Sequence, residues 1–198
     1  MAVSRLTQTT LQNGFEKFNR IWDERSAVGS MEAISAITLS AAQSSVEFNN
    51  IPGTYTHLQI RAIGRTNLGG SVLDNVVFQF NSDTGSNYTV HHLNGNGSSA
   101  SAGADTPRNN TIFLRATGSS ATSGNFGLAV CDILDYANTN KFKTIRSLSG
   151  YDNNGSGELF FWSGLWRNTA AISSISIFEN GNLANISQYS SFTLYGIK

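Results

Sequence analysis

The clearest pattern of apolar and polar residues in the chain predicts a strand, a turn and a second strand over residues 45–66 (SVEFNNIPGTYTHLQIRAIGRT). Val46 and Phe48 alternate with polar residues, as in a strand that buries one face. The dipeptide Pro52-Gly53 then marks a turn, because proline and glycine supply the backbone angles that tight turns require. The alternation resumes at Tyr55, which we take as the start of the second strand.

This second strand has two unlike faces. Successive side chains of a strand point to opposite sides, so Leu58, Ile60 and Ala62 share one face, and we expect that face to be buried. The opposite face carries the polar and aromatic row Tyr55, His57, Gln59 and Arg61.

Similar short strands follow one another through the rest of the chain. The breaks between them are rich in Gly, Asn, Asp and Ser, the residues that dominate turns. Many short strands with frequent turns predict a mainly β protein, a jelly-roll-like antiparallel β-sandwich over residues 31–198. The predicted strands are residues 34–39, 44–48, 55–63, 75–80, 88–93, 111–116, 126–134, 142–148, 158–166, 172–178 and 191–197.

Two segments depart from simple alternation. Residues 158–166 (ELFFWSGLW) are apolar or aromatic on both faces, so we expect this strand to be central in its sheet or covered by another chain. Residues 94–110 (NGNGSSASAGADTPRNN) contain few apolar side chains. They predict a long mobile loop unless a neighbour orders them.

The beginning of the chain has a different period. Leu11, Phe15, Phe18 and Trp22 are spaced by 4, 3 and 4 residues, which predicts a short amphipathic helix with one apolar stripe. We therefore divide the chain into an N-terminal helix and linker, residues 1–30, and the β-sandwich domain, residues 31–198. The stripe either packs on the chain's own sheet or anchors it to a neighbouring subunit, since large aromatic residues are enriched at interfaces.

The chain has few charges and they balance. Of 198 residues, 13 are basic and 13 acidic, giving a formal net charge of zero. Nucleic acids and anionic membranes bind clustered basic surfaces, so neither is an expected partner. A neutral surface favours self-association and suits a protein that works inside an assembly. The alternative is a neutral monomer kept soluble by hydroxyl and amide groups.

Cysteine content and hydrophobic runs predict a protein that is made in a cytoplasm. The single cysteine, Cys131, lies in an apolar run and cannot form an intrachain disulfide; we expect it to be a small buried side chain. No apolar run is long enough for a transmembrane helix. The N-terminus lacks the apolar segment of a signal peptide, so we expect no export by the standard route.

The sequence contains no recognisable catalytic motif, and we expect neither a cofactor nor a metal. Asp83 begins an Asp-Thr-Gly triplet, but aspartic proteases need two carboxylates sharing a proton, and no second triplet exists. A calcium site using Asp74, Asp83 or Asp152 is an alternative, although the loops lack regular calcium-ligand spacing. His91 and His92 are adjacent on a predicted strand and therefore point to opposite faces.

Five aromatic residues suggest a ligand surface. Tyr55, Tyr88, Tyr151, Trp162 and Trp166 could form a platform for a sugar or a protein partner. For Trp162 and Trp166 we favour packing in the core. Tyr88 and Tyr151, together with the loops beside them, form the candidate glycan-binding surface.

Three blocks of the sequence together resemble a known type of domain. Residues 51–66 (IPGTYTHLQIRAIGRT), 76–99 (VVFQFNSDTGSNYTVHHLNGNGSS) and 190–198 (SSFTLYGIK) are similar to a β-domain of tailed-bacteriophage structural proteins, especially of marine and cyanobacterial phages. The opening residues 1–23 resemble the short N-terminal segment of such proteins. The resemblance rests on structural residues and does not identify the position of the protein in a virion.

The resemblance implies a non-enzymatic protein that is made in the host cytoplasm, is located in the virion and assembles as an oligomer, commonly a trimer. Our first hypothesis is a decoration or cement protein that binds the major capsid protein and sister subunits through Leu11, Phe15, Phe18 and Trp22. The second is a tail-fibre module that recognises host glycan. The third is an enzyme such as a depolymerase, which would need paired carboxylates in a groove.

Overall fold

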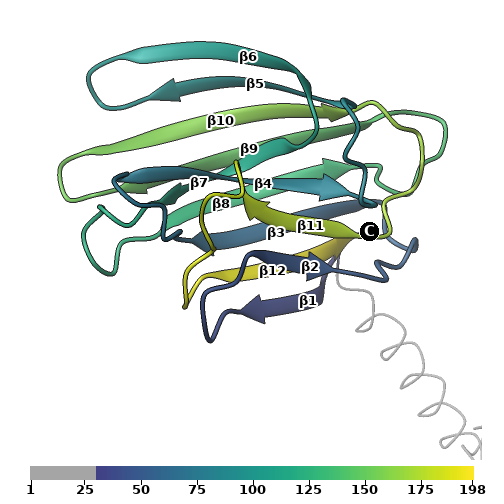
Figure 1. Ribbon diagram of the computed structural model, residues 1–198. Coiled ribbons are helices and arrows are strands. Elements are labelled where there is room, and N and C mark those ends of the chain that lie inside the picture. Colours follow the sequence, from purple (N-terminus) through teal and green to yellow (C-terminus); the bar gives the residue numbers. More distant parts are fainter. Residues whose placement is uncertain (1–29) are drawn as a thin grey trace, which may run out of the picture.

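The computed structural model describes residues 30–198, which form a β-sandwich of two antiparallel sheets (Figure 1). Its strands are β1 (Met31–Thr38), β2 (Ser45–Phe48), β3 (His57–Gly64), β4 (Leu73–Phe80), β5 (Tyr88–Gly95), β6 (Ala100–Arg108), β7 (Thr111–Thr117), β8 (Gly127–Leu134), β9 (Lys143–Asp152), β10 (Gly157–Trp166), β11 (Ile175–Glu179) and β12 (Ser191–Ile197).

One sheet is twice as wide as the other. The large sheet has the order β1-β12-β3-β8-β9-β10-β5-β6, and the small sheet has the order β2-β11-β4-β7. Strands far apart in sequence are therefore neighbours, as for β12 beside β3 and β11 beside β4. The predicted antiparallel β-sandwich is confirmed, and each of the eleven predicted strands overlaps an observed one.

The predicted helix lies outside the described residues. Within residues 30–198 no helix occurs, so none there is long and apolar enough to cross a membrane.

The predicted mobile loop over residues 94–110 is wrong. Residues 100–108 form β6, which pairs with β5 along its length and is the last strand of the large sheet. Ala, Ser and Gly dominate the strand and give it no apolar alternation. Its position is fixed by backbone hydrogen bonds to β5, which leave no trace in the side-chain pattern.

Aromatic side chains fill one end of the space between the sheets. Phe78 and Phe80 of β4 have ring centroids 4.8 Å apart, and Phe113 of β7 lies 5.0 Å from Phe78. Trp166 of β10 lies 5.3 Å from Phe80, and Tyr88 of β5 lies 6.3 Å from Trp166. All five are fully buried, so rings from both sheets form one packed layer.

A second apolar cluster joins the wide end of the large sheet to the small sheet. Phe160 and Trp162 of β10 stack 4.7 Å apart and pack with Val77 of β4 and Ile112 of β7. The guanidinium of Arg115 lies 4.6 Å from the Phe160 ring centre. This cluster buries the inward face of β10 beyond the main core.

A buried carboxylate lies near one end of the small sheet. Asp74 of β4 accepts hydrogen bonds from Thr66 Oγ1 at 2.6 Å and from the Asn75 backbone N–H at 2.7 Å. Burial raises the pKa of Asp74 to about 6, because desolvation and the nearby Glu179 charge outweigh these hydrogen bonds. The folded protein therefore binds this proton more tightly than the unfolded chain does.

We predict that Asp74 lowers the stability of the protein as the pH rises. The folded carboxyl titrates near pH 6 and the unfolded one near pH 3.8, so the penalty grows between about pH 4 and pH 6. Two pKa units correspond to about 3 kcal/mol. Asp74→Asn should match the wild type at pH 4 and exceed its free energy of unfolding at pH 8 by up to that amount. Urea unfolding at both pH values measures the difference.

Asp83→Asn provides a control of opposite sign. Partial burial raises the pKa of Asp83, but hydrogen bonds from Trp166 Nε1, the Asn87 amide and the Gly85 N–H outweigh it, and the net pKa is lowered. Its carboxylate stabilises the fold above pH 4, so this variant should lose stability at pH 8 and approach the wild type at low pH. An Asp74→Asn variant that is less stable than the wild type at pH 8 would contradict the assignment.

Candidate functional site

The outer face of the large sheet, which points away from the small sheet, carries a group of exposed or half-buried apolar side chains. In β10, Phe160 and Trp162 point inward and are buried, whereas Leu159 and Phe161 point outward and are 59% and 49% exposed. β5, β8 and β9 likewise bury apolar side chains on their inner face and carry other apolar side chains on their outer face. We call the group the outer apolar face: Ile63, Leu93, Leu128, Val130, Leu148, Leu159 and Phe161.

Strand register aligns four of these residues in one row across the sheet. Leu93 of β5 is opposite Phe161 of β10, Phe161 is opposite Leu148 of β9, and Leu148 is opposite Val130 of β8. Directly opposite residues have Cβ atoms about 5 Å apart, so their side chains form a continuous apolar strip.

The adjacent row alternates large side chains with glycines. Leu159 of β10 lies between Gly95 and Gly150, and Leu128 of β8 lies between Gly150 and Ile63 of β3. A Cβ atom on Gly150 would lie 2.6 Å from the Glu158 carbonyl oxygen, so the strand pairing itself requires glycine there. The missing side chain leaves a low point between two leucines.

This low point belongs to a hollow of about 700 Å³ on the outer face. Leu128, Leu148 and Leu159 line it together with Phe126 and Tyr151. Tyr151 is partly buried, with its pKa raised by partial burial and by the Glu158 carboxylate. The hollow suits an apolar or aromatic side chain of a partner, since interface anchors insert into such sites.

A polar row borders the apolar strip on its other side. Gln59 of β3 donates from Nε2 to Asp132 Oδ1 of β8 at 2.8 Å, and Arg146 of β9 donates to Ser163 Oγ of β10. His91 of β5 is opposite Ser163 and is exposed. An apolar centre with a hydrogen-bonded polar border is the usual composition of a protein interface.

A second hollow, of about 640 Å³, lies on the outer side of the small sheet and is largely polar. Glu47, Gln79, Ser176 and Phe178 of β2, β4 and β11 line it. Ser176 Oγ donates to Glu47 Oε2 at 2.6 Å, and Gln79 Nε2 donates to the Asn109 carbonyl at 2.8 Å. These polar groups are already hydrogen-bonded within the chain.

The residues singled out from the sequence are only partly brought together. Leu11, Phe15, Phe18 and Trp22 lie outside the described residues. Tyr151 lines the apolar hollow.

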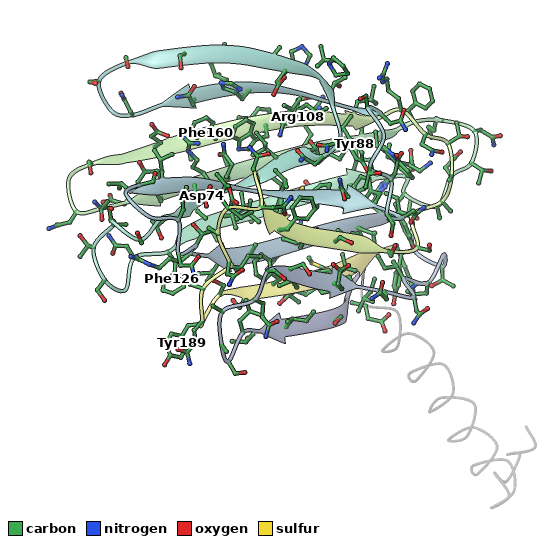
Figure 2. The ribbon with its side chains drawn as sticks, viewed as in Figure 1. Asp74, Tyr88, Arg108, Phe126, Phe160 and Tyr189 are labelled. Carbon is green, nitrogen blue, oxygen red and sulfur yellow. The ribbon has the colours of Figure 1, made fainter. Side chains whose placement is uncertain are left out.

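The assignment of Tyr88 to an exposed glycan surface is wrong. The side chain of Tyr88, labelled in Figure 2, is fully buried. Its hydroxyl accepts the Phe80 backbone N–H at 2.9 Å. Burial raises the pKa of the hydroxyl. Tyr88 points inward because it shares a strand face with the buried Val90.

The tryptophans and the cysteine have the environments expected of core residues. Trp162 and Trp166 are 3% and 0% exposed, which confirms their packing in the core. Cys131 is fully buried, as predicted, and burial raises the pKa of its thiol. A buried neutral thiol is a poor nucleophile.

The three candidate acidic ligands lie apart. Asp74 is buried near Thr66, Asp83 bonds to Trp166, and Asp152 accepts the N–H of Asn154 within a loop. Between residues 30 and 198, no three His, Cys, Asp or Glu side chains gather where they could hold a metal ion.

The outward apolar residues of β8 and β9 were missed in the sequence. Leu128 and Leu148 lie in predicted strands but were not assigned to a surface. The signal was present in residues 126–134 and 142–148, where apolar residues occupy both faces, as they do in residues 158–166.

The chain was also compared with known proteins. A scan against models of known protein families found no match, and a search of curated protein sequences found no significant similarity. The argument for function therefore depends on the site and on the sequence resemblance to virion β-domains described above.

The two faces of β10 should respond differently to truncation. Phe160→Ala removes a buried ring that packs against Trp162 and Arg115 and should cost about 3–5 kcal/mol of unfolding free energy. Phe161→Ala removes a half-exposed ring and should cost less than about 1 kcal/mol. Urea unfolding at low protein concentration measures both. Equal losses would show that the outer ring is also packed within a single subunit.

Proposed function

We propose that the protein is a non-enzymatic structural protein of a tailed-phage virion, a decoration or cement protein that binds the capsid shell as an oligomer. The observation that carries this proposal is the outer apolar face. Six of its seven residues are exposed in the single chain and Val130 is half-buried, and contiguous apolar surface of this kind marks a protein contact. The sequence resemblance to virion β-domains supplies the class of assembly.

We further propose that the sandwich is a jelly roll with two added hairpins. If β5–β6 and β9–β10 are set aside, the remaining strands form sheets β1-β12-β3-β8 and β2-β11-β4-β7. The chain then changes sheet at every step except from β4 to β7, which are neighbours in the small sheet, and this path supports an eight-stranded jelly roll. The hairpins add four strands to the side of β8 and provide most of the outer apolar face.

The contacts within the assembly would use both this face and the N-terminal segment. The partners are the major capsid protein and sister subunits, assembled as a homotrimer. A few large apolar side chains dominate the binding energy of such contacts, while the polar border excludes water. The low net charge of the chain fits a contact that does not rely on electrostatic attraction.

Binding of purified protein to phage particles that lack it tests this proposal. The double variant Phe15→Ala with Trp22→Ala should lose binding, because it removes two of the four predicted anchors. The β-sandwich should remain folded by circular dichroism, since neither residue belongs to it. Unchanged binding by the double variant would contradict the anchor role.

Antibody labelling of intact particles in the electron microscope separates the two virion locations. Label spread over the head supports decoration or cement, and absence of label from every particle would overturn the proposal. Label confined to the tail would favour a tail-fibre module that binds host glycan.

The second hollow is the observation that favours the glycan alternative. It presents Glu47, Gln79 and Ser176 beside the ring of Phe178, and sugars bind polar groups next to an aromatic surface. Tyr151, named from the sequence for this role, lies on the large sheet instead. A glycan array with saturable binding that is lost in Phe178→Ala would support this alternative.

A further inference from the structure

We propose that the outer apolar face of the large sheet receives the aromatic stripe Leu11, Phe15, Phe18 and Trp22 from a neighbouring copy of this chain. The inference rests on the oligomeric assembly proposed above and names the partner of that face.

Chemical complementarity is the first argument. The face offers an apolar strip from Val130 to Leu93 and a hollow beside Gly150. The opening segment of the chain offers four apolar side chains, three of them aromatic, at helical spacing. A helix of twelve residues is about 18 Å long, and four strands spaced about 4.8 Å apart are similarly wide.

The place where the segment joins the sandwich is the second argument. Ser30 accepts a hydrogen bond from the Lys198 N–H, which holds the start of β1 beside the end of β12. β1 is the strand at the opposite edge of the large sheet from β6. The segment therefore joins the sheet away from the outer apolar face.

The separation can be estimated from sheet geometry. β12, β3 and β8 lie between β1 and β9, which places Gly150 four strand spacings, about 19 Å, from β1. Met31 is level with His57 and Gly150 with Ile63, through the intervening pairs. These two β3 positions are six residues, about 20 Å, apart along the strand. These two perpendicular offsets place Met31 and Gly150 about 28 Å apart.

This distance favours a neighbouring subunit over the chain's own sheet. Nine residue steps separate Trp22 from Met31, the residue from which the 28 Å separation is measured. A random coil of that length spans about 16 Å on average, and only an almost fully extended chain reaches about 28 Å. Docking on its own sheet would thus place Trp22 at the hollow only with an almost fully stretched connection. Docking on a sister subunit does not require a fully stretched connection. If each subunit in a ring donates its stripe to the next, the exchange closes the oligomer.

Disulfide trapping tests the proposal with the full-length protein. Chains carrying Phe18→Cys and chains carrying Leu148→Cys, with different tags, are co-expressed and oxidised. The native Cys131 is fully buried and does not compete. We expect a disulfide between the two kinds of chain. Leu183→Cys, at a leucine that is 82% exposed in the loop before β12, is the matched control and should give no such product.

Two results of the trapping experiment would overturn the proposal. One is equal cross-linking to Leu148→Cys and Leu183→Cys, or none to either. The other comes from a single chain carrying both Phe18→Cys and Leu148→Cys: a disulfide within one chain at high dilution would place the segment on its own sheet.

Tryptophan quenching gives an independent readout in the unmodified chain. Trp162 and Trp166 are buried, so acrylamide reports mainly on Trp22. We expect Trp22 to be protected in the wild-type oligomer and exposed in Leu148→Asp, while Leu183→Asp leaves it protected. Quenchable Trp22 in the wild-type oligomer would contradict the proposal.

Both measurements use purified protein without particles, so they separate this inference from the proposed function. Chains that cross-link yet bind no particle would keep the exchange and overturn the virion role. Chains that bind particles without cross-linking would keep the virion role and overturn the exchange between subunits.

Discussion

The alternation of side chains along a strand is the constraint on which this structure depends. A strand can bury one of its two faces against the opposite sheet, and the other face must meet water or a partner. In β8, β9 and β10 both sets of side chains include large apolar residues. Burying Phe160 and Trp162 against the small sheet leaves Phe161 and Leu159 outside, because no change of register can turn all four inward.

Because the large sheet is wide, the outward apolar side chains of several neighbouring strands form one continuous surface. The small sheet has four strands and covers part of an eight-stranded sheet. The hairpins β5–β6 and β9–β10 extend the large sheet, and the second apolar cluster around Phe160 holds their inner side against β4 and β7. Their outer side is supported rigidly, which favours a preorganised contact. The glycine at position 150 gives this contact its hollow.

The sequence predicted the strands well where burial is one-sided. Leu58, Ile60 and Ala62 are buried as the alternation of β3 required. β6 was missed, because a strand of mostly small residues that is fixed by backbone pairing has no periodic signal.

Individual environments were harder to predict than strands. Tyr88 was assigned to the surface, although tyrosine is equally suited to a core position where its hydroxyl finds a backbone partner. Lys143 is fully buried with its ammonium donating to the carbonyls of Asn138 and Lys141 in the preceding loop and to that of Thr169, which only the fold brings close. The outer apolar face likewise needed the register of four strands, which one sequence does not specify.

The most direct test of the account is hydroxyl-radical footprinting of the purified wild-type protein at assembly concentration, read out by residue. The central claim is that the outer apolar face is a buried contact in the working assembly. Leu148, Leu159 and Phe161 should be protected from oxidation, while Leu183, which is more exposed in the single chain than any of them, should be oxidised freely. Oxidation of the three face residues at the rate set by their single-chain exposure would contradict the claim.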